Sequence, residues 1–147
     1  MEIFAKTYSQ LYKIKTIGLR FFTVYGPHGR PDMAPYKFLK SIKNGTPIEK
    51  YGDGTSSRDY TYVDDIVSGI IGAMFSNNIN HDIYNLGNSK PVTLNSFIET
   101  CEKVCGNKAN VINKSMPLGD VPHTFANINR ARAVSYTHLT LPTILRV

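Results

Sequence analysis

The sequence predicts an α/β fold, and three observations carry that prediction. Apolar residues recur at helical spacing in several segments, and short apolar runs typical of strands separate those segments. Clusters of glycine and proline mark the joints between them. Alternation of this kind is typical of sheets covered by helices. The chain has 147 residues, 41% of them hydrophobic, which suits one domain and is too short for two ordinary ones.

The first half of the chain begins with a predicted amphipathic helix. Phe4, Tyr8, Leu11 and Tyr12 fall at i, i+4, i+7 and i+8, so they share one helix face. Short apolar runs and turn residues predict the elements that follow. These are a strand over 16–22, a Gly- and Pro-rich loop over 25–32, a helix over 35–43 ending at Asn44-Gly45, a strand over 47–51 and an extended stretch over 59–63.

The second half begins with the clearest helical pattern, an apolar stripe over 63–75 with two aspartates in its first turn, where the helix dipole favours them. A strand over 83–86 ends at Gly87. Thr93 is a predicted N-cap for a helix that ends at Gly106. The last elements are a strand-like stretch over 109–112 and a helix that starts at 130–134. Residues 135–147 have one charge and no helical period, so they do not continue that helix.

Composition excludes several classes of protein. The net charge of +6 is spread along the chain, and Lys37, Lys40 and Lys43 are expected to form a solvated helix face, so we expect no nucleic-acid partner. No apolar run approaches the roughly 20 residues of a membrane span. The first residues lack the layout of a signal peptide, and Cys101 and Cys105 are expected to be small buried side chains. These features predict a cytoplasmic protein with no metal site.

Three positions are candidate ligand contacts, each with a plainer alternative. Arg30 lies in the loop from Thr23 to Asp32, which follows the C-terminal end of a predicted strand, and open α/β sheets bind ligands at such ends. The alternative is an exposed loop arginine without a ligand. Arg58 follows a tight turn. The alternative to a ligand contact is a surface ion pair with its neighbour Asp59. Asp120 can accept hydrogen bonds from a ribose diol and is otherwise a turn aspartate. Gly-rich residues 52–57 half-match a dinucleotide fingerprint, but no helix is predicted to start there, so we interpret them as a turn.

Four ordered motifs resemble the extended short-chain dehydrogenase/reductase family, and within it the UDP-glucuronate 4-epimerases. The first is GLRFFTVYGP at residues 18–27, continued by GRPDMA at 29–34. The others are YGDGTSSRDYTYVDDI at 51–66, YNLGNS at 84–89 and GDVP at 119–122. The resemblance implies the end of a Rossmann-type NAD-binding domain together with a smaller domain that holds the sugar nucleotide, over residues 1–134. Residues 135–147 are expected to be a tail foreign to the family, of the kind that translated sequencing adaptor produces.

The resemblance also implies which side chains face NAD and a UDP-sugar. They are Phe22 beside the nicotinamide, Thr23 at the sugar's C5 substituent, Arg30 at the substrate carboxylate or its surroundings, Phe38 near the uracil, Arg58 at the diphosphate and Asp120 at the uridine ribose. The family's glycine-rich NAD loop and its catalytic Tyr-x-x-x-Lys pair belong before residue 1, and Tyr8 with Tyr12 is not that pair. We therefore assign no catalytic residue to this chain.

Three hypotheses about function remain open. The first is the C-terminal portion of an NAD-dependent epimerase acting on UDP-glucuronate, inactive alone, whose parent enzyme is a homodimer through helices that include the first one here. The second is a stand-alone module that binds sugar nucleotides. The third is a truncated gene product without function. Related dehydratases and decarboxylases share these motifs, so the motifs leave the reaction and the sugar open.

Overall fold

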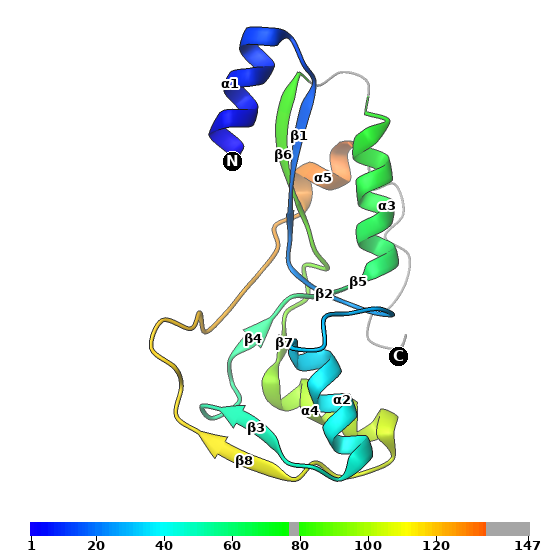
Figure 1. Ribbon diagram of the computed structural model, residues 1–147, viewed down its shortest axis with the longest axis vertical. Helices are drawn as coiled ribbons and strands as arrows, with labels where there is room; N and C mark the ends of the chain where they lie inside the picture. Colours follow the sequence, from blue (N-terminus) through cyan, green and yellow to red (C-terminus); the bar gives the residue numbers. More distant parts are fainter. Residues whose placement is uncertain (77–79, 135–147) are drawn as a thin grey trace.

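A computed structural model describes residues 1–76 and 80–134 of the chain (Figure 1). The helices are α1 (Glu2–Tyr12), α2 (Ala34–Asn44), α3 (Val63–Met74), α4 (Leu94–Cys105) and α5 (Asn129–Val134). The strands are β1 (Thr16–Phe21), β2 (Thr23–Tyr25), β3 (Ile48–Tyr51), β4 (Ser57–Arg58), β5 (Tyr60–Tyr62), β6 (His81–Leu86), β7 (Val92–Thr93) and β8 (Val111–Lys114). Three of the four strand pairs are parallel, which confirms the predicted α/β class.

The upper part of the molecule in Figure 1 is built on two parallel strand pairs. β1 pairs with β6 along its whole length, and β2, which follows β1 after one residue, pairs with β5. Helices α3 and α5 cover one side, where Ile66, Tyr84, Leu86 and Ala131 form a buried cluster. Helix α1 lies against β1 and β6 through its short side chains, and the buried Ser9 hydroxyl donates to the carbonyl of Asn80 at 2.8 Å.

The lower part has a core of its own. Helices α2 and α4 pack against each other and against β3, which pairs in parallel with β8. Their buried side chains are Phe38, Ile42, Ile48, Ile98 and Cys101. The short antiparallel pair β4–β7 lies between this core and the upper strands.

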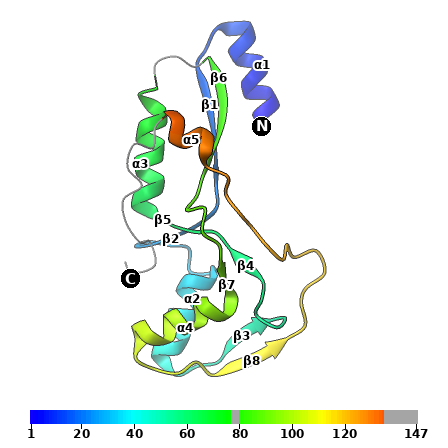
Figure 2. The same ribbon diagram turned by 180° about the vertical axis from the view of Figure 1, so that it is seen from behind.

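Residues 115–128, which we name the return segment, connect the two parts. They run from the end of β8 back to α5 along one side of the molecule (Figure 1, Figure 2). The segment is tied to β4 by main-chain hydrogen bonds, from Ser57 N to Pro122 O at 2.8 Å and from Thr124 N to Ser57 O at 3.1 Å. Since β4 leads directly into β5, the return segment lies beside the link between the two cores.

Most predicted elements are confirmed, some with shifted ends. The Thr93 side chain caps α4 by accepting from Ser96 N at 3.2 Å. The assignment of Thr23–Tyr25 to a loop is wrong, because these residues form β2 against β5. Strand β7 was not predicted. The predicted tail, 135–147, lies outside the described residues.

No helix in residues 1–76 and 80–134 has both the length and the apolarity needed to cross a membrane. No group of three or more His, Cys, Asp or Glu side chains in the same residues is arranged to hold a metal ion.

Candidate functional site

A cavity of about 660 Å³ lies between α2, β3, β8 and the return segment, and we name it the nucleotide cavity for the role proposed below. Three of the six residues predicted to face a ligand line it: Phe38, Arg58 and Asp120. They come from α2, β4 and the return segment. The fold therefore brings together an aromatic ring, a guanidinium and a carboxylate that are up to 82 residues apart in the chain.

The Arg58 guanidinium is fixed on the cavity wall by the return segment. Its Nη2 donates to Asp120 Oδ1 at 2.8 Å, and its Nη1 donates to the carbonyl oxygens of Ser57 at 3.0 Å and Pro122 at 3.3 Å. The side chain is one quarter exposed, so part of it stays open to the cavity. The surface pair with Asp59, which was the alternative for Arg58, is not formed. A planar cation beside a carboxylate suits a ligand that carries both phosphates and hydroxyls.

Asp59 has a different role, which the sequence analysis missed. Its side chain is completely buried. Its Oδ1 accepts from Asn88 N at 2.8 Å, and its Oδ2 accepts from Ala126 N at 3.0 Å. Its own N–H donates to the Thr124 hydroxyl at 3.1 Å. One carboxylate thus holds the loop after β6 and the return segment together, one residue away from Arg58.

Phe38 belongs to the lower core as well as to the cavity wall. Its side chain is buried, and its ring centroid lies 5.8 Å from that of Phe97. Tyr60 stacks on the same Phe97 ring. The two ring centroids are 4.6 Å apart, and the ring planes are inclined by 14°. Burial raises the pKa of Tyr60 to about 12, so its phenol stays protonated at neutral pH. Phe38 and Tyr60 therefore give the cavity wall an uncharged aromatic part, and Phe97 packs behind them.

Thr23 and Phe22 lie where β1 ends and β2 begins. Thr23 N donates to the carbonyl of Asp59 at 3.1 Å, and Phe22 N donates to the carbonyl of Leu86 at 3.2 Å. Neither residue lines the cavity. Thr23 is nevertheless connected to Arg58 through one residue, since it bonds to Asp59, which follows Arg58.

Arg30 is not brought to the nucleotide cavity. It forms an exposed pair with Asp32, with Nε 3.1 Å from Oδ1, which also raises the pKa of Arg30 and lowers that of Asp32 through their hydrogen bonds. Arg30 lines a second, mostly apolar cavity of about 350 Å³ on the other side of α2. Tyr60 and Val92 line both cavities, so the two are neighbours.

One pair within α2 has the spacing of the family's catalytic motif, whose own pair is expected before residue 1. Tyr36 and Lys40 are separated as in Tyr-x-x-x-Lys. Lys40 Nζ lies 5.7 Å from the centroid of the Tyr36 ring, a cation–π contact on the helix surface. Neither residue lines the nucleotide cavity, so the spacing alone does not make them a catalytic pair there.

Comparison with known proteins gives the same family as the four sequence motifs. The family model described as "NAD dependent epimerase/dehydratase family" matches residues 1–87. A probable UDP-glucuronate 4-epimerase of Rhizobium meliloti is 41% identical over 92% of this chain and 45% of its own length. A UDP-glucuronate 4-epimerase of Thermodesulfobacterium geofontis is 41% identical over 89% of this chain and 40% of its own.

Solved structures of such enzymes share the fold. The UDP-glucuronic acid 4-epimerase of Bacillus cereus, in complex with UDP-glucuronic acid and NAD, is 31% identical and superposes with a TM-score of 0.90, covering 97% of this chain and 46% of that protein. A UDP-N-acetylglucosamine 4-epimerase of Methanobrevibacter ruminantium is 28% identical with a TM-score of 0.85, covering 92% of this chain and 44% of that protein.

The chain thus spans less than half the length of these relatives. The family model matches more than half of the chain itself. This chain belongs to the NAD dependent epimerase/dehydratase family.

Proposed function

We propose that this chain forms the sugar-nucleotide side of an NAD-dependent 4-epimerase that interconverts UDP-glucuronate and UDP-galacturonate. The observation that carries the proposal is the nucleotide cavity, which gathers Phe38, Arg58 and Asp120 in a chain whose relatives carry that enzyme's name. We assign the family part to residues 1–134 and leave residues 135–147 out of the function.

The chemistry of the cavity wall supports a uridine diphosphate as ligand. Arg58 supplies a cation for the diphosphate, and its bond to Asp120 keeps it in place before the ligand arrives. Asp120 supplies carboxylate oxygens for the ribose hydroxyls. The Phe38 ring, on the wall beside them, gives an apolar contact for the uracil.

The sugar and NAD are assigned to the region around Phe22 and Thr23, at the junction of β1 and β2. Thr23 faces the C5 substituent in this proposal, and Arg30 meets the uronate carboxylate after leaving Asp32. Phe22 is assigned to the flat nicotinamide ring, and its half-buried side chain lies beside Gly87. The chemistry that NAD supplies in this family is removal and return of the hydride at C4 of the sugar.

We further propose that the chain alone binds but does not epimerise. The sequence contains no G-x-G-x-x-G phosphate loop, so the phosphates of NAD are assigned to residues outside this sequence. The same applies to the catalytic base. Free Cys101 and Cys105 support a reducing compartment, the cytoplasm. The pairing of Arg30 and Arg58 with carboxylates supports a small polar ligand rather than nucleic acid.

Calorimetric titration with UDP and UDP-glucuronate tests the binding proposal. We expect both to bind the unaltered chain, and Arg58→Gln to weaken UDP binding about tenfold or more, because a charge-assisted contact is lost. Arg20→Gln is the control, because Arg20 bonds to Glu2 far from the cavity. An absence of heat with either nucleotide contradicts the proposal.

Incubation of the chain with NAD and UDP-glucuronate tests whether the chain alone is inactive. Sustained formation of UDP-galacturonate overturns the proposed inactivity.

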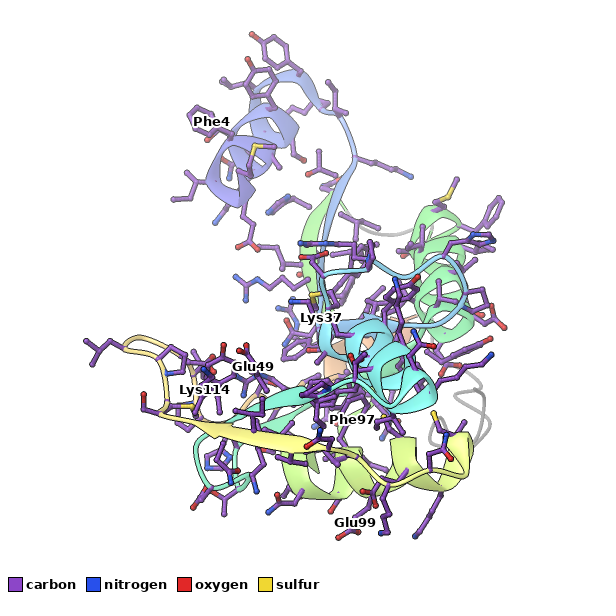
Figure 3. The ribbon with its side chains drawn as sticks, turned by 60° about the horizontal axis from the view of Figure 1, so that its bottom comes forward. Phe4, Lys37, Glu49, Phe97, Glu99 and Lys114 are labelled. Atoms are coloured by element: carbon purple, nitrogen blue, oxygen red, sulfur yellow. The ribbon has the colours of Figure 1, made fainter. Side chains whose placement is uncertain are left out.

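The homodimer is proposed through α1. This helix presents Ile3, Phe4, Tyr8, Leu11 and Tyr12 to solvent, with Phe4 70% and Leu11 67% exposed. Figure 3 shows Phe4 on the helix surface, directed away from the strands. An exposed apolar stripe on a helix at the edge of the molecule can be covered by the same stripe of a second copy.

Light scattering after size-exclusion chromatography tests the dimer. We expect the unaltered chain to elute as a dimer at micromolar concentration and Leu11→Glu to elute as a monomer, because the substitution places a charge in the apolar contact. Gln10→Glu adds the same charge to an exposed position of α1 beside that stripe and should stay dimeric. A monomeric unaltered chain, or an unaffected Leu11→Glu, contradicts this assignment.

A further inference from the structure

The face of α2 that lines the nucleotide cavity carries one cation as well as Phe38. Ala34, Lys37, Phe38 and Ser41 all line the cavity, and they fall at i, i+3, i+4 and i+7 of the helix. Residues with this spacing share one side of a helix. Lys37, Lys40 and Lys43 are all exposed, as expected of a solvated helix face, but of the three only Lys37 lines the cavity. Lys37 therefore differs from Lys40 and Lys43 because it faces the nucleotide cavity.

Each charged side chain around the cavity except Lys37 is in an ion pair, and Lys37 acts on Asp32 only from a longer distance, where its charge helps to lower the pKa of that carboxyl. Two cations line the wall, Arg58 and Lys37, and Arg58 bonds to Asp120 at 2.8 Å. Glu49 lies 3.8 Å from Lys114 Nζ and accepts from the Tyr51 hydroxyl at 2.9 Å, a bond that raises the pKa of Tyr51. Within residues 1–76 and 80–134, Lys37 has no carboxylate within 4.0 Å of its ammonium.

A diphosphate needs more positive charge than Arg58 alone supplies. The guanidinium is already shared with the Asp120 carboxylate, so the pair has no net charge. The diphosphate of a bound UDP-sugar brings two negative charges into a wall that also holds Glu49 and Asp32. Like charges held close together cost free energy unless a cation separates them. The unpaired lysine is the group on this wall that can balance the ligand.

We propose that Lys37 is a second phosphate-binding residue, which contacts the diphosphate together with Arg58; this rests on the proposed function. Figure 3 shows Lys37 on α2 and Glu49 with Lys114 on the neighbouring strands β3 and β8. The four-carbon stem of lysine lets the ammonium follow a phosphate group while the helix stays fixed. Arg58 fixes the position of the diphosphate by its planar geometry, and Lys37 adds charge.

Titration calorimetry of the full chain with UDP and with uridine tests the role of Lys37. We expect Lys37→Gln to bind UDP about tenfold more weakly than the unaltered chain and to bind uridine equally well, because uridine has no phosphate. Lys43→Gln is the matched control: it removes the same charge from the same helix at a residue that lines neither cavity, and it should change UDP binding less than twofold. The loss in Lys37→Gln should shrink when the salt concentration is raised.

Three results overturn the proposal. Equal UDP affinities of Lys37→Gln and Lys43→Gln contradict it, because the proposal requires Lys37→Gln to bind UDP more weakly. If Lys37→Gln loses the same affinity for uridine as for UDP, the lysine shapes the cavity and does not contact the phosphates. Failure of the unaltered chain to bind UDP overturns the proposed function itself, and this outcome is distinct because it needs no variant.

Discussion

Asp59→Asn is expected to lower the free energy of unfolding by about 2–4 kcal/mol. The carboxylate is completely buried, and each of its oxygens accepts a main-chain N–H from a different segment, Asn88 at 2.8 Å and Ala126 at 3.0 Å. An asparagine keeps the shape but offers one acceptor and one NH₂ donor. One of the two main-chain N–H groups would then face another donor and lose its partner. Because that N–H is buried, water cannot replace the lost bond.

Urea unfolding followed by circular dichroism measures this effect, with Asp53→Asn as the matched control. Asp53 also accepts a main-chain N–H, from Thr55 at 2.9 Å, together with the Thr55 hydroxyl at 2.6 Å. Its carboxylate is exposed, so water can satisfy the groups it leaves, and we expect a loss below about 1 kcal/mol. The interpretation of Asp59 as the link between segments is contradicted when the two variants lose the same stability.

The same substitution should act on ligand binding through the return segment. Asp120 reaches Arg58 because Pro122, Thr124 and Ala126 are bonded to residues 57–59. A weaker bond at Ala126 leaves the segment less firmly placed, so Asp59→Asn should also weaken UDP binding under conditions where the protein remains folded. Asp59 would then be a positioning residue, acting through Asp120 and Arg58 without touching the nucleotide.

Local patterns in the sequence predicted those parts of the fold whose causes are local. The stripe over 63–75 predicts α3, and the hydroxyl of Thr93 predicts the start of α4, because both depend on residues a few positions apart. Strand β2 was missed because its three residues pair with β5, 37 positions further along the chain. A strand that short has too few residues to show a period of two.

The candidate site was predicted unevenly for the same reason. The family motifs pointed to Arg58 and Asp120, but no local feature tells which carboxylate Arg58 meets. Its neighbour Asp59 was the obvious partner from the sequence, whereas the fold turns that side chain inward and brings Asp120 from 62 residues away. The unpaired state of Lys37 was equally hidden, since the helix spacing predicted a solvated face. Pairing between distant charges is decided by the fold, so motif spacing cannot reveal it.

Gly87, the residue after β6, lies close to Ala126 of the return segment. A Cβ built on Gly87 would stand 2.3 Å from the Cβ of Ala126, far inside van der Waals contact. Ala126 is buried, with its N–H bonded to Asp59 and its carbonyl to the Ser89 hydroxyl, so it has little room to move. The backbone of Gly87 is not in the left-handed region, and an alanine there would be strained only by this contact.

Gly87→Ala is therefore expected to lower the free energy of unfolding by about 2–3 kcal/mol, as overpacking does in well-packed interiors. Gly18→Ala is the control: its added Cβ would meet the Cγ1 atom of Ile83 at 3.3 Å, a side-chain atom that can yield, and it should cost less than about 1 kcal/mol. The double variant Gly87→Ala/Ala126→Gly moves the methyl group to the other side of the contact and should recover most of the loss. The difference between the double variant and the sum of the single ones measures the coupling of the two positions. A double variant as unstable as Gly87→Ala alone would show that the methyl–methyl contact is not what requires glycine, and the return segment would then be held by its hydrogen bonds to Asp59 and β4 alone.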